Sequence, residues 1–140
     1  FLLITVSNCG YEPTLKKNIN LSIQKFELLG DKNINRRIVS LLGLKKKISN
    51  TSDYTLTLNS QKSIISAAKD KSGKTSVFRT VINLKLQLNQ NGKLIKERSF
   101  SSNFTYNNSE NNHDLLQYQK TIEINLTNKI FEEIIIFLST

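Results

Sequence analysis

The stretch from Ser76 to Tyr106 constrains the fold most, because it contains two alternating segments joined by a turn signal. Apolar side chains share one face of the first segment, and these are Phe78, Ile82, Leu84, Leu86 and Leu88. This period of two is the pattern of a half-buried strand. The Asn91-Gly92 pair then favours a tight hairpin turn. One face of this hairpin therefore needs an apolar cover, which the rest of the chain must supply.

The register of this hairpin depends on the length of its loop. A two-residue loop would pair Leu86 with Glu97 and would mix apolar with polar side chains on one face. We therefore predict a three-residue loop over 90–92, which places Gly92 where a left-handed residue is needed. The cross-strand pairs predicted from it are Leu88 with Leu94, Ile82 with Phe100, Phe78 with Phe104, and the oppositely charged Lys85 with Glu97.

The remaining elements follow from the same periodicities. We predict strands over 20–29 and 54–65, a helix over 34–42, a turn over 69–74 and a long helix over 114–138. One apolar stripe runs along the long helix, and its members are Leu115, Ile122, Leu126, Ile130, Ile134 and Phe137.

Capping residues support both helices. Asp31 or Asn33 can cap the first helix, Gly43 stands where that helix ends, and Asn112 is the expected cap of the second. The predicted fold is α+β: a two-layer sandwich in which a mostly antiparallel four-stranded sheet carries two helices on one face. The opposite face of the sheet bears polar side chains and is exposed or meets a polar partner.

Composition limits the possible functions. The net charge of +9 favours an anionic partner, which could be nucleic acid, phospholipid headgroups or a phosphorylated glycolipid, although a solvated basic surface explains the charge equally well. The chain has one Cys and one His, which exclude an internal disulfide framework and a Cys/His zinc site. We therefore predict no catalytic residues, no metal site, no cofactor and no enzymatic activity.

The N-terminal residues suggest a lipid anchor. An apolar run ends in Val6, Ser7, Asn8 and Cys9, which resembles the recognition pattern of a bacterial lipoprotein signal peptide, although Asn8 departs from the usual Ala or Gly. We expect residues 1–8 to be the remnant of a signal peptide, 9–19 to be a linker after the lipid attachment site at Cys9, and 20–140 to be the folded domain. A short buried strand that carries a free Cys is the alternative.

From Cys9 to the C-terminus, the sequence resembles the LPS-assembly lipoprotein LptE family. The resemblance depends on the order of several weak motifs: Cys9-Gly10-Tyr11, Asp31 before the 34–42 helix, the 69–74 turn that leads into a long alternating strand, Arg98-Ser99-Phe100, and the amphipathic last helix. It implies a non-enzymatic outer-membrane lipoprotein, anchored by acyl chains such as palmitate on the periplasmic side, that plugs the LptD β-barrel in lipopolysaccharide transport.

The same resemblance implies a lipopolysaccharide-binding role for a basic side chain in the loop between the second and third strands. Lys71 occupies that place, and Lys69 and Lys74 are the neighbouring candidates, although solvated turn lysines are the alternative for all three. The family's second basic site has no counterpart, because residues 107–112 contain no Lys or Arg. A basic nucleic-acid-binding module remains the alternative function, and it predicts exposed aromatic side chains on the open face of the sheet.

Overall fold

A computed structural model describes residues 23–43 and 54–140. Cys9, the expected linker over 9–19 and the expected signal-peptide remnant over 1–8 lie outside the described residues. The lipid attachment site therefore stays a prediction from sequence.

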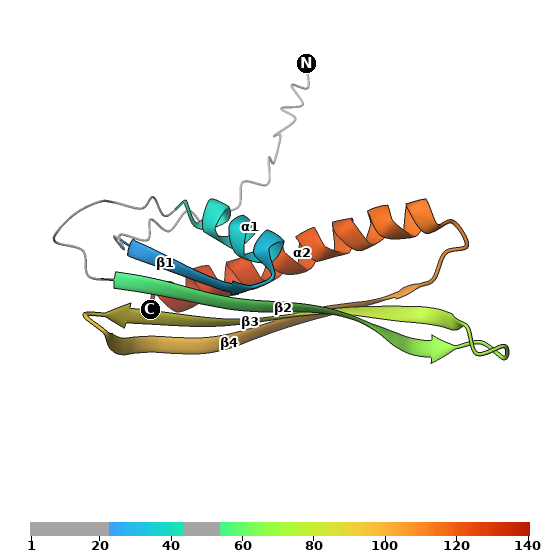
Figure 1. Ribbon diagram of the computed structural model, residues 1–140, viewed down its shortest axis with the longest axis horizontal. Coiled ribbons are helices and arrows are strands. Elements are labelled where there is room, and N and C mark those ends of the chain that lie inside the picture. Colours follow the sequence, from blue (N-terminus) through green and yellow to red (C-terminus); the bar gives the residue numbers. More distant parts are fainter. Residues whose placement is uncertain (1–22, 44–53) are drawn as a thin grey trace, which may run out of the picture.

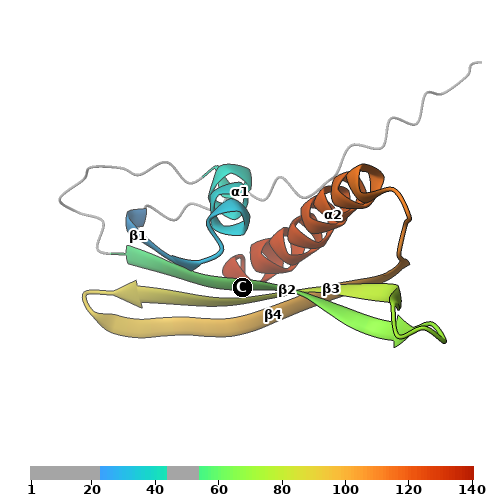
Figure 2. The same ribbon diagram turned by 45° about the vertical axis from the view of Figure 1, so that its right-hand side comes forward.

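The described chain forms one four-stranded sheet and two helices, in the order β1 (Ile23–Gly30), α1 (Lys32–Leu42), β2 (Tyr54–Lys69), β3 (Thr75–Gln90), β4 (Lys93–Asn107) and α2 (Asn112–Leu138). The strands lie in sequence order across the sheet; β1 is parallel to β2, and the other neighbours are antiparallel. Both helices lie on the same side of the sheet (Figures 1 and 2). The predicted α+β architecture is confirmed.

Local capping explains where the helices begin and end. The Asp31 carboxylate accepts hydrogen bonds from the backbone N–H groups of Asn33 and Ile34, both at 3.0 Å, and Gly43 ends α1 in a left-handed conformation. The cap of α2 is Asn111, whose side chain accepts from the amides of the second and third helical residues at 3.0 and 3.2 Å. The prediction of Asn112 was wrong by one residue, because Asn112 already lies inside the helix.

The central hairpin has a shorter loop than predicted. Asn91 and Gly92 alone connect β3 to β4, and both have positive φ angles, of 51° and 75°. Two successive left-handed residues are the signature of a tight turn whose twist matches that of the strands. The predicted three-residue loop is therefore wrong.

A β-bulge next to this turn resolves the conflict between apolar and polar faces. Leu88 pairs with Lys96 but Asn89 pairs with Leu94, so Ile95 is an extra residue on β4. The tight turn alone would give the register that mixes the two faces. One inserted residue returns every later side chain of β4 to the face that the alternation predicts.

The predicted partners are therefore wrong. The predicted faces are right for the residues of β4 after the bulge but wrong for Leu94, which lies before it and pairs with Asn89 of the open face. Leu88–Leu94, Ile82–Phe100, Phe78–Phe104 and Lys85–Glu97 are replaced by Leu88–Lys96, Leu84–Phe100, Phe78–Tyr106 and Lys85–Ser99. The charge attraction persists along a diagonal, because Lys85 Nζ lies 3.2 Å from Glu97 Oε1.

One apolar core fills the space between the sheet and the helices. Its buried members are Ile23, Ile34, Ile38, Leu56, Leu58, Ile82, Leu84, Leu86, Leu88, Phe100, Tyr106, Ile122, Leu126, Ile130, Ile134 and Leu138. The central part of the predicted α2 stripe belongs to this core, and the ends of the stripe, Leu115 and Phe137, pack against it partly buried. The core leaves the opposite face of the sheet without a cover in the described structure.

Candidate functional site

The turn between β2 and β3 is organised by one aspartate. Asp70 Oδ1 accepts hydrogen bonds from the Ser72 amide (2.9 Å), the Ser72 hydroxyl (2.6 Å) and the Lys74 amide (3.0 Å). Gly73 has a φ of 86°, a left-handed conformation that glycine adopts without strain, and its amide bonds to the Asp70 carbonyl oxygen. The turn is therefore a defined structure although it is exposed.

The hydrogen bonds also fix the charge of Asp70. The bond from the Ser72 side chain, followed by the bond from the Lys74 amide, holds the pKa of the Asp70 carboxyl below its ordinary value. The carboxylate stays ionised at neutral pH. Its Oδ1 atom already accepts three hydrogen bonds from Ser72 and Lys74 of the same turn. The carboxylate supports the loop and leaves the neighbouring ammonium groups available to an outside anion.

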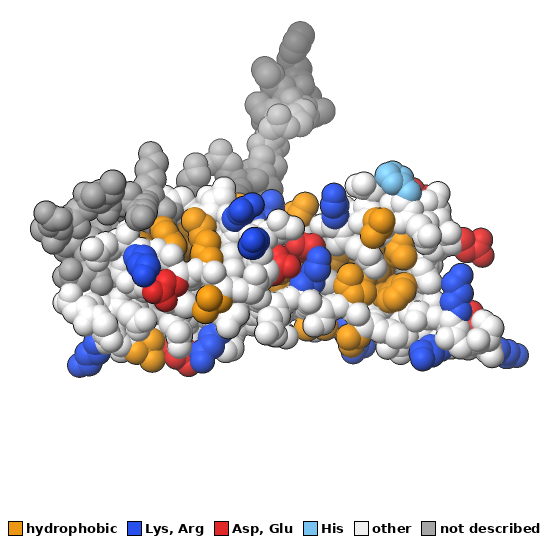
Figure 3. All heavy atoms as spheres, in the orientation of Figure 1, with side chains coloured by type: hydrophobic (Ala, Val, Ile, Leu, Met, Phe, Trp, Pro, Cys, Tyr) orange, Lys and Arg blue, Asp and Glu red, His pale blue; other side chains and the backbone are white. Residues whose placement is uncertain are grey.

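The structure places the three predicted lysines together at this end of the sheet. Lys69 is the last residue of β2, Lys71 lies in the turn, Lys74 directly precedes β3, and all three are exposed. The turn projects beyond the helices (Figure 1, right), and basic side chains are visible there in Figure 3. Within residues 23–43 and 54–140, none of the three forms an ion pair. Such a turn can bind phosphate groups as point charges.

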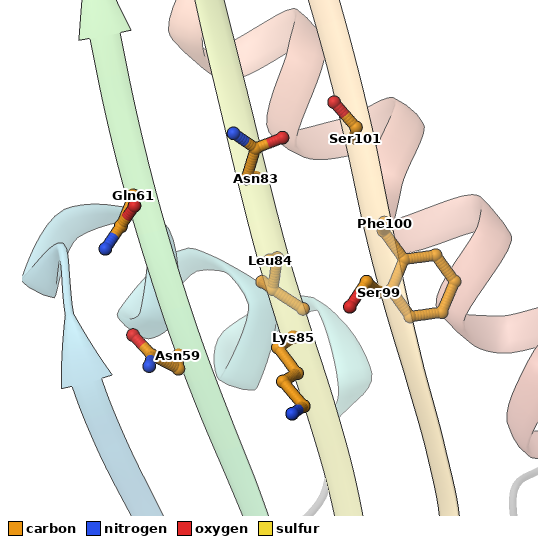
Figure 4. A pocket seen from close by; sticks show the side chains of 8 residues that line it. All are labelled: Asn59, Gln61, Asn83, Leu84, Lys85, Ser99, Phe100 and Ser101. Atoms are coloured by element: carbon orange, nitrogen blue, oxygen red, sulfur yellow. The ribbon is translucent and has the colours of Figure 1, made fainter.

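A second feature lies on the sheet face that turns away from the helices. A shallow depression of about 400 Å³ crosses strands β2, β3 and β4. Its polar side chains are Asn59, Gln61, Asn83, Lys85, Ser99 and Ser101. Figure 4 shows these side chains on the near side of the strands, with both helices behind. We call this surface the polar face.

The polar face can form hydrogen bonds in both directions. Amides and hydroxyls each donate and accept, so they suit a hydrated or hydrogen-bonding partner better than a strongly charged one. In the described part of the chain, no three His, Cys, Asp or Glu side chains gather as metal ligands would. The sequence predicted a polar surface here but not the depression, which depends on how three strands align.

The aromatic side chains of the long strands lie on the other face. Phe78, Phe100 and Tyr106 belong to the core or pack against it. Phe104 is 46% exposed but lines a crevice with Tyr118 of α2, so it also points to the helix side. The β-strands described here thus place no aromatic ring on the open face, where the nucleic-acid alternative needs stacking platforms. This arrangement weighs against that alternative.

The crevice beside Phe104 is small and apolar. It has a volume of about 200 Å³ between β4 and α2, and Tyr118, Ile122 and Leu126 contribute to its wall. Apolar side chains are visible below this part of α2 in Figure 3. Neither of the two described helices combines the length and apolarity that crossing a bilayer requires.

Comparisons with known proteins support the fold. No protein-family model and no curated protein matches this sequence. Among solved structures, a minor lipoprotein from Acinetobacter baumannii is 12% identical with a TM-score of 0.60, and the match covers 85% of this chain and 92% of that one. Rare lipoprotein B from Shewanella oneidensis is 12% identical with a TM-score of 0.56, over 79% and 92% of the two chains.

A third structure agrees with these two. An uncharacterized lipoprotein B from Nitrosomonas europaea is 8% identical with a TM-score of 0.56, and the match covers 82% of this chain and 81% of that one. At such identities the likeness is one of fold. The chain therefore has the same fold as several bacterial lipoproteins.

Proposed function

We propose that this chain is an outer-membrane lipoprotein that plugs and supports an LptD-like β-barrel in lipopolysaccharide transport. Its anchor is a lipid on Cys9, and its place is the periplasmic side of the outer membrane. The role is non-enzymatic and uses no cofactor. One observation carries the proposal: a fold shared with bacterial lipoproteins presents a sheet face, turned away from both described helices, whose polar side chains are uncharged except for Lys85, which pairs with Glu97.

The polar face has the chemistry that a barrel interior accepts. The lumen of an outer-membrane barrel is polar and wet. Asn59, Gln61, Asn83 and Ser101 can exchange hydrogen bonds with such a surface without the desolvation cost of burying net charge. Because the polar side chains of this depression are hydrogen-bonding groups, we expect many modest contacts to hold the plug.

The lysine turn provides the second half of the proposal. Lipopolysaccharide carries phosphate groups, and Lys69, Lys71 and Lys74 present ammonium groups on a turn that Asp70 stiffens. A stiff loop loses less entropy when it binds than a loose one. We place the anionic part of lipopolysaccharide at this turn.

Co-purification tests the barrel partner. The full-length gene is expressed with a tag beside the LptD-like barrel of the same genome, and membranes are extracted in mild detergent. We expect a stoichiometric barrel that survives a high-salt wash, since hydrogen bonds and shape hold the complex. Ser101→Arg adds a charge to the polar face and should release the barrel. Gln117→Arg adds the same charge to an exposed position of α2 and should not.

Two outcomes would contradict this part of the proposal. The first is a tagged protein in the soluble fraction with Cys9 unmodified by mass spectrometry, which removes the lipoprotein assignment. The second is a lipid-modified protein in the membrane fraction that co-purifies with no barrel. This result would support the lipid anchor but contradict the barrel partner.

A charge-reversal pair tests the lysine turn. Lys71→Glu should weaken lipopolysaccharide binding several-fold, because it replaces attraction to phosphate by repulsion. Lys93→Glu is the matched control, since Lys93 is an equally exposed lysine beside the turn at the other end of the hairpin. Equal losses in both variants would show that binding responds to net charge alone and would remove the special role of Lys71.

A further inference from the structure

Among the described residues, the far half of β2 pairs with a strand on one side only. β1 pairs with β2 from Tyr54 to Ser60, where the chain turns away at Gly30 into α1. β2 continues to Lys69, paired with β3 alone in the described structure. Figure 2 shows this part of β2 continuing past β1, with β3 as its neighbouring strand. We call residues 61–69 the free edge.

The backbone groups of the free edge can be assigned a direction. The Ser60 carbonyl oxygen accepts a 3.0 Å hydrogen bond from the Asp31 amide, so the peptide groups of Ser60 point toward the β1 side. Successive residues of a strand direct these groups to alternate edges. Lys62, Ile64 and Ser66 therefore direct their N–H and C=O groups outward, where a further strand would bond to them.

The usual protection of an edge is confined to the last residues of the free edge, where the register with β3 shifts between Ser66 and Ala68 and again between Ala68 and Lys69, and it is missing over 61–66. Edge strands are commonly guarded by proline, bulges or outward lysines. The free edge has no proline, and the lysine near its start lies over the helix face, where Lys62 Nζ bonds to Glu123 Oε2 of α2 at 2.9 Å. Ile64 and Ile65 remain 42% and 44% exposed on opposite faces. These β-branched residues suit a pleated surface that continues into another strand.

The other edge of the sheet differs. β4 carries the bulge at Ile95 and, within a few residues of it, the charged side chains of Lys93, Lys96 and Arg98. Both devices discourage pairing. The two edges therefore provide a comparison within one molecule.

We infer that the free edge of β2 accepts an extended acidic segment of another protein as an added strand. Backbone hydrogen bonds would supply the affinity, and alternate side chains would meet Ile64 and Ile65. The acidic character follows from Lys69, Lys71 and Lys74 at the end of the edge. A second copy of this chain would bring the same lysines and a net charge of +9, so it is a poorer match. The inference does not require a barrel partner, but it uses the same three lysines that the proposed function gives to lipopolysaccharide, so the two ligands would compete for this turn.

A synthetic peptide probes this edge directly. It is a fluorescein-labelled acidic peptide of about nine residues, in which Val and Thr alternate before a run of Glu, matched to the length of the free edge. A second version carries N-methyl groups on alternate backbone nitrogens. A third version is methylated on every backbone nitrogen of the Val/Thr stretch, so it has the same charge but no backbone donor on either edge, and we call this third version the N-methylated peptide. Binding to the full chain is measured by fluorescence anisotropy.

Two proline variants separate the edges. Ile64→Pro removes one outward N–H from the free edge and leaves the bonds between β2 and β3 in place. Asn103→Pro is its counterpart on β4. The Asn108 amide bonds to Ser76 of β3, so even-numbered residues of β4 face β3 and Asn103 faces outward. Thermal unfolding followed by circular dichroism establishes that both variants fold.

The expected results are a saturable interaction with the unmodified peptide, at least tenfold weaker binding by Ile64→Pro, and unchanged binding by Asn103→Pro. The N-methylated peptide should not bind, and this comparison holds even if Ile64→Pro does not fold. Equal binding of both peptides would reduce the interaction to charge and overturn the inference, as would loss of binding in Asn103→Pro alone. Equal binding of a Lys-containing peptide would overturn the acidic assignment. A dimer of this chain that dissociates in Ile64→Pro but not in Asn103→Pro would identify a second copy as the occupant of the free edge instead.

Discussion

The two ends of β2 lie in different surroundings although they belong to one continuous strand. Leu58 is 0% exposed between β1, β3 and the helices, whereas Ile64, on the same face, is 42% exposed. The near end has neighbours on both edges and a cover of core residues. The far end has one neighbouring strand, the free edge and the lysine turn. Stability is therefore concentrated in the near end, whereas the free edge and the lysine turn, two of the surfaces offered to partners, lie at the far end.

The largest expected contrast comes from truncating one side chain at each end. Leu58→Ala should lower the free energy of unfolding by about 3–4 kcal/mol, because it leaves a cavity in a closed core. Ile64→Ala should cost about 1 kcal/mol or less, since much of its surface is already in water. Urea unfolding measures both, with an unchanged denaturant slope as the control for compactness. A cost for Ile64→Ala as large as that for Leu58→Ala would mean that the far end is covered.

Two glycines sharpen the same comparison. Gly30 has a φ of 87°, and a Cβ there would lie 1.9 Å from the Ser60 carbonyl oxygen, so Gly30→Ala should cost about 2–3 kcal/mol. Gly73 has a similar φ of 86° with open space around it, and Gly73→Ala should cost about 1 kcal/mol from backbone strain alone. The difference between the two variants isolates the close approach of β1 to β2. Equal losses of stability in the two variants, measured by thermal unfolding, would show that backbone strain alone accounts for both.

A third contrast compares polar pairs. The Ser60 hydroxyl donates to Asn35 Oδ1 at 2.7 Å, both side chains are buried, and Asn35 Nδ2 also bonds to the Leu29 carbonyl oxygen. A double-mutant cycle of Asn35→Ala and Ser60→Ala should give a coupling energy of about 1 kcal/mol. The Lys62–Glu123 ion pair, at 32% and 16% side-chain exposure, should give about 0.5 kcal/mol and weaken with salt. A larger coupling energy for the Lys62–Glu123 pair than for the Asn35–Ser60 pair would contradict the concentration of stability in the near end of β2.

The sequence predicted the elements well because their signals are local. Period-two alternation in β3, the 3.6-residue stripe of α2 and the caps at Asp31 and Gly43 each depend on residues close together in the chain. The family resemblance pointed to the lysine turn, and its composition predicted a turn there. That the turn is rigid depends on Asp70, whose three hydrogen bonds no composition rule specifies.

The missed features depend on neighbours that are distant in sequence. The register of β4 was wrong because the bulge at Ile95 arises from two demands at once, a tight Asn91-Gly92 turn and a consistent apolar face. The free edge could not be predicted, because it exists only where β1 stops at Gly30 while β2 continues. The depression on the polar face likewise requires three strands to be aligned. Each is a property of the sheet rather than of a segment.

The smallest expected effect concerns the protonation of the lysine turn. The folded-state pKa of Asp70 lies below its ordinary value of 3.8, chiefly because the Ser72 side chain donates to it, so the charged form favours the folded turn. This contribution is complete above the ordinary pKa and is lost as pH falls through 3.8 and then through the lower folded-state pKa. Above pH 5 it should be constant.

The amide proton shifts of Ser72 and Lys74, followed by NMR as the pH is lowered, measure this titration directly. They should move together with a midpoint below 3.8, and Asp70→Asn should abolish the movement. Glu97 provides the control within the same spectra: hydrogen bonds from Gln87 and Lys85 lower its pKa as well, and its titration should survive Asp70→Asn. A midpoint at or above 3.8 for the turn amides would mean that Asp70 does not hold the turn. The far end would then present its lysines on a loose loop, and the argument for preorganised anion binding would fail while the contrast in burial remained.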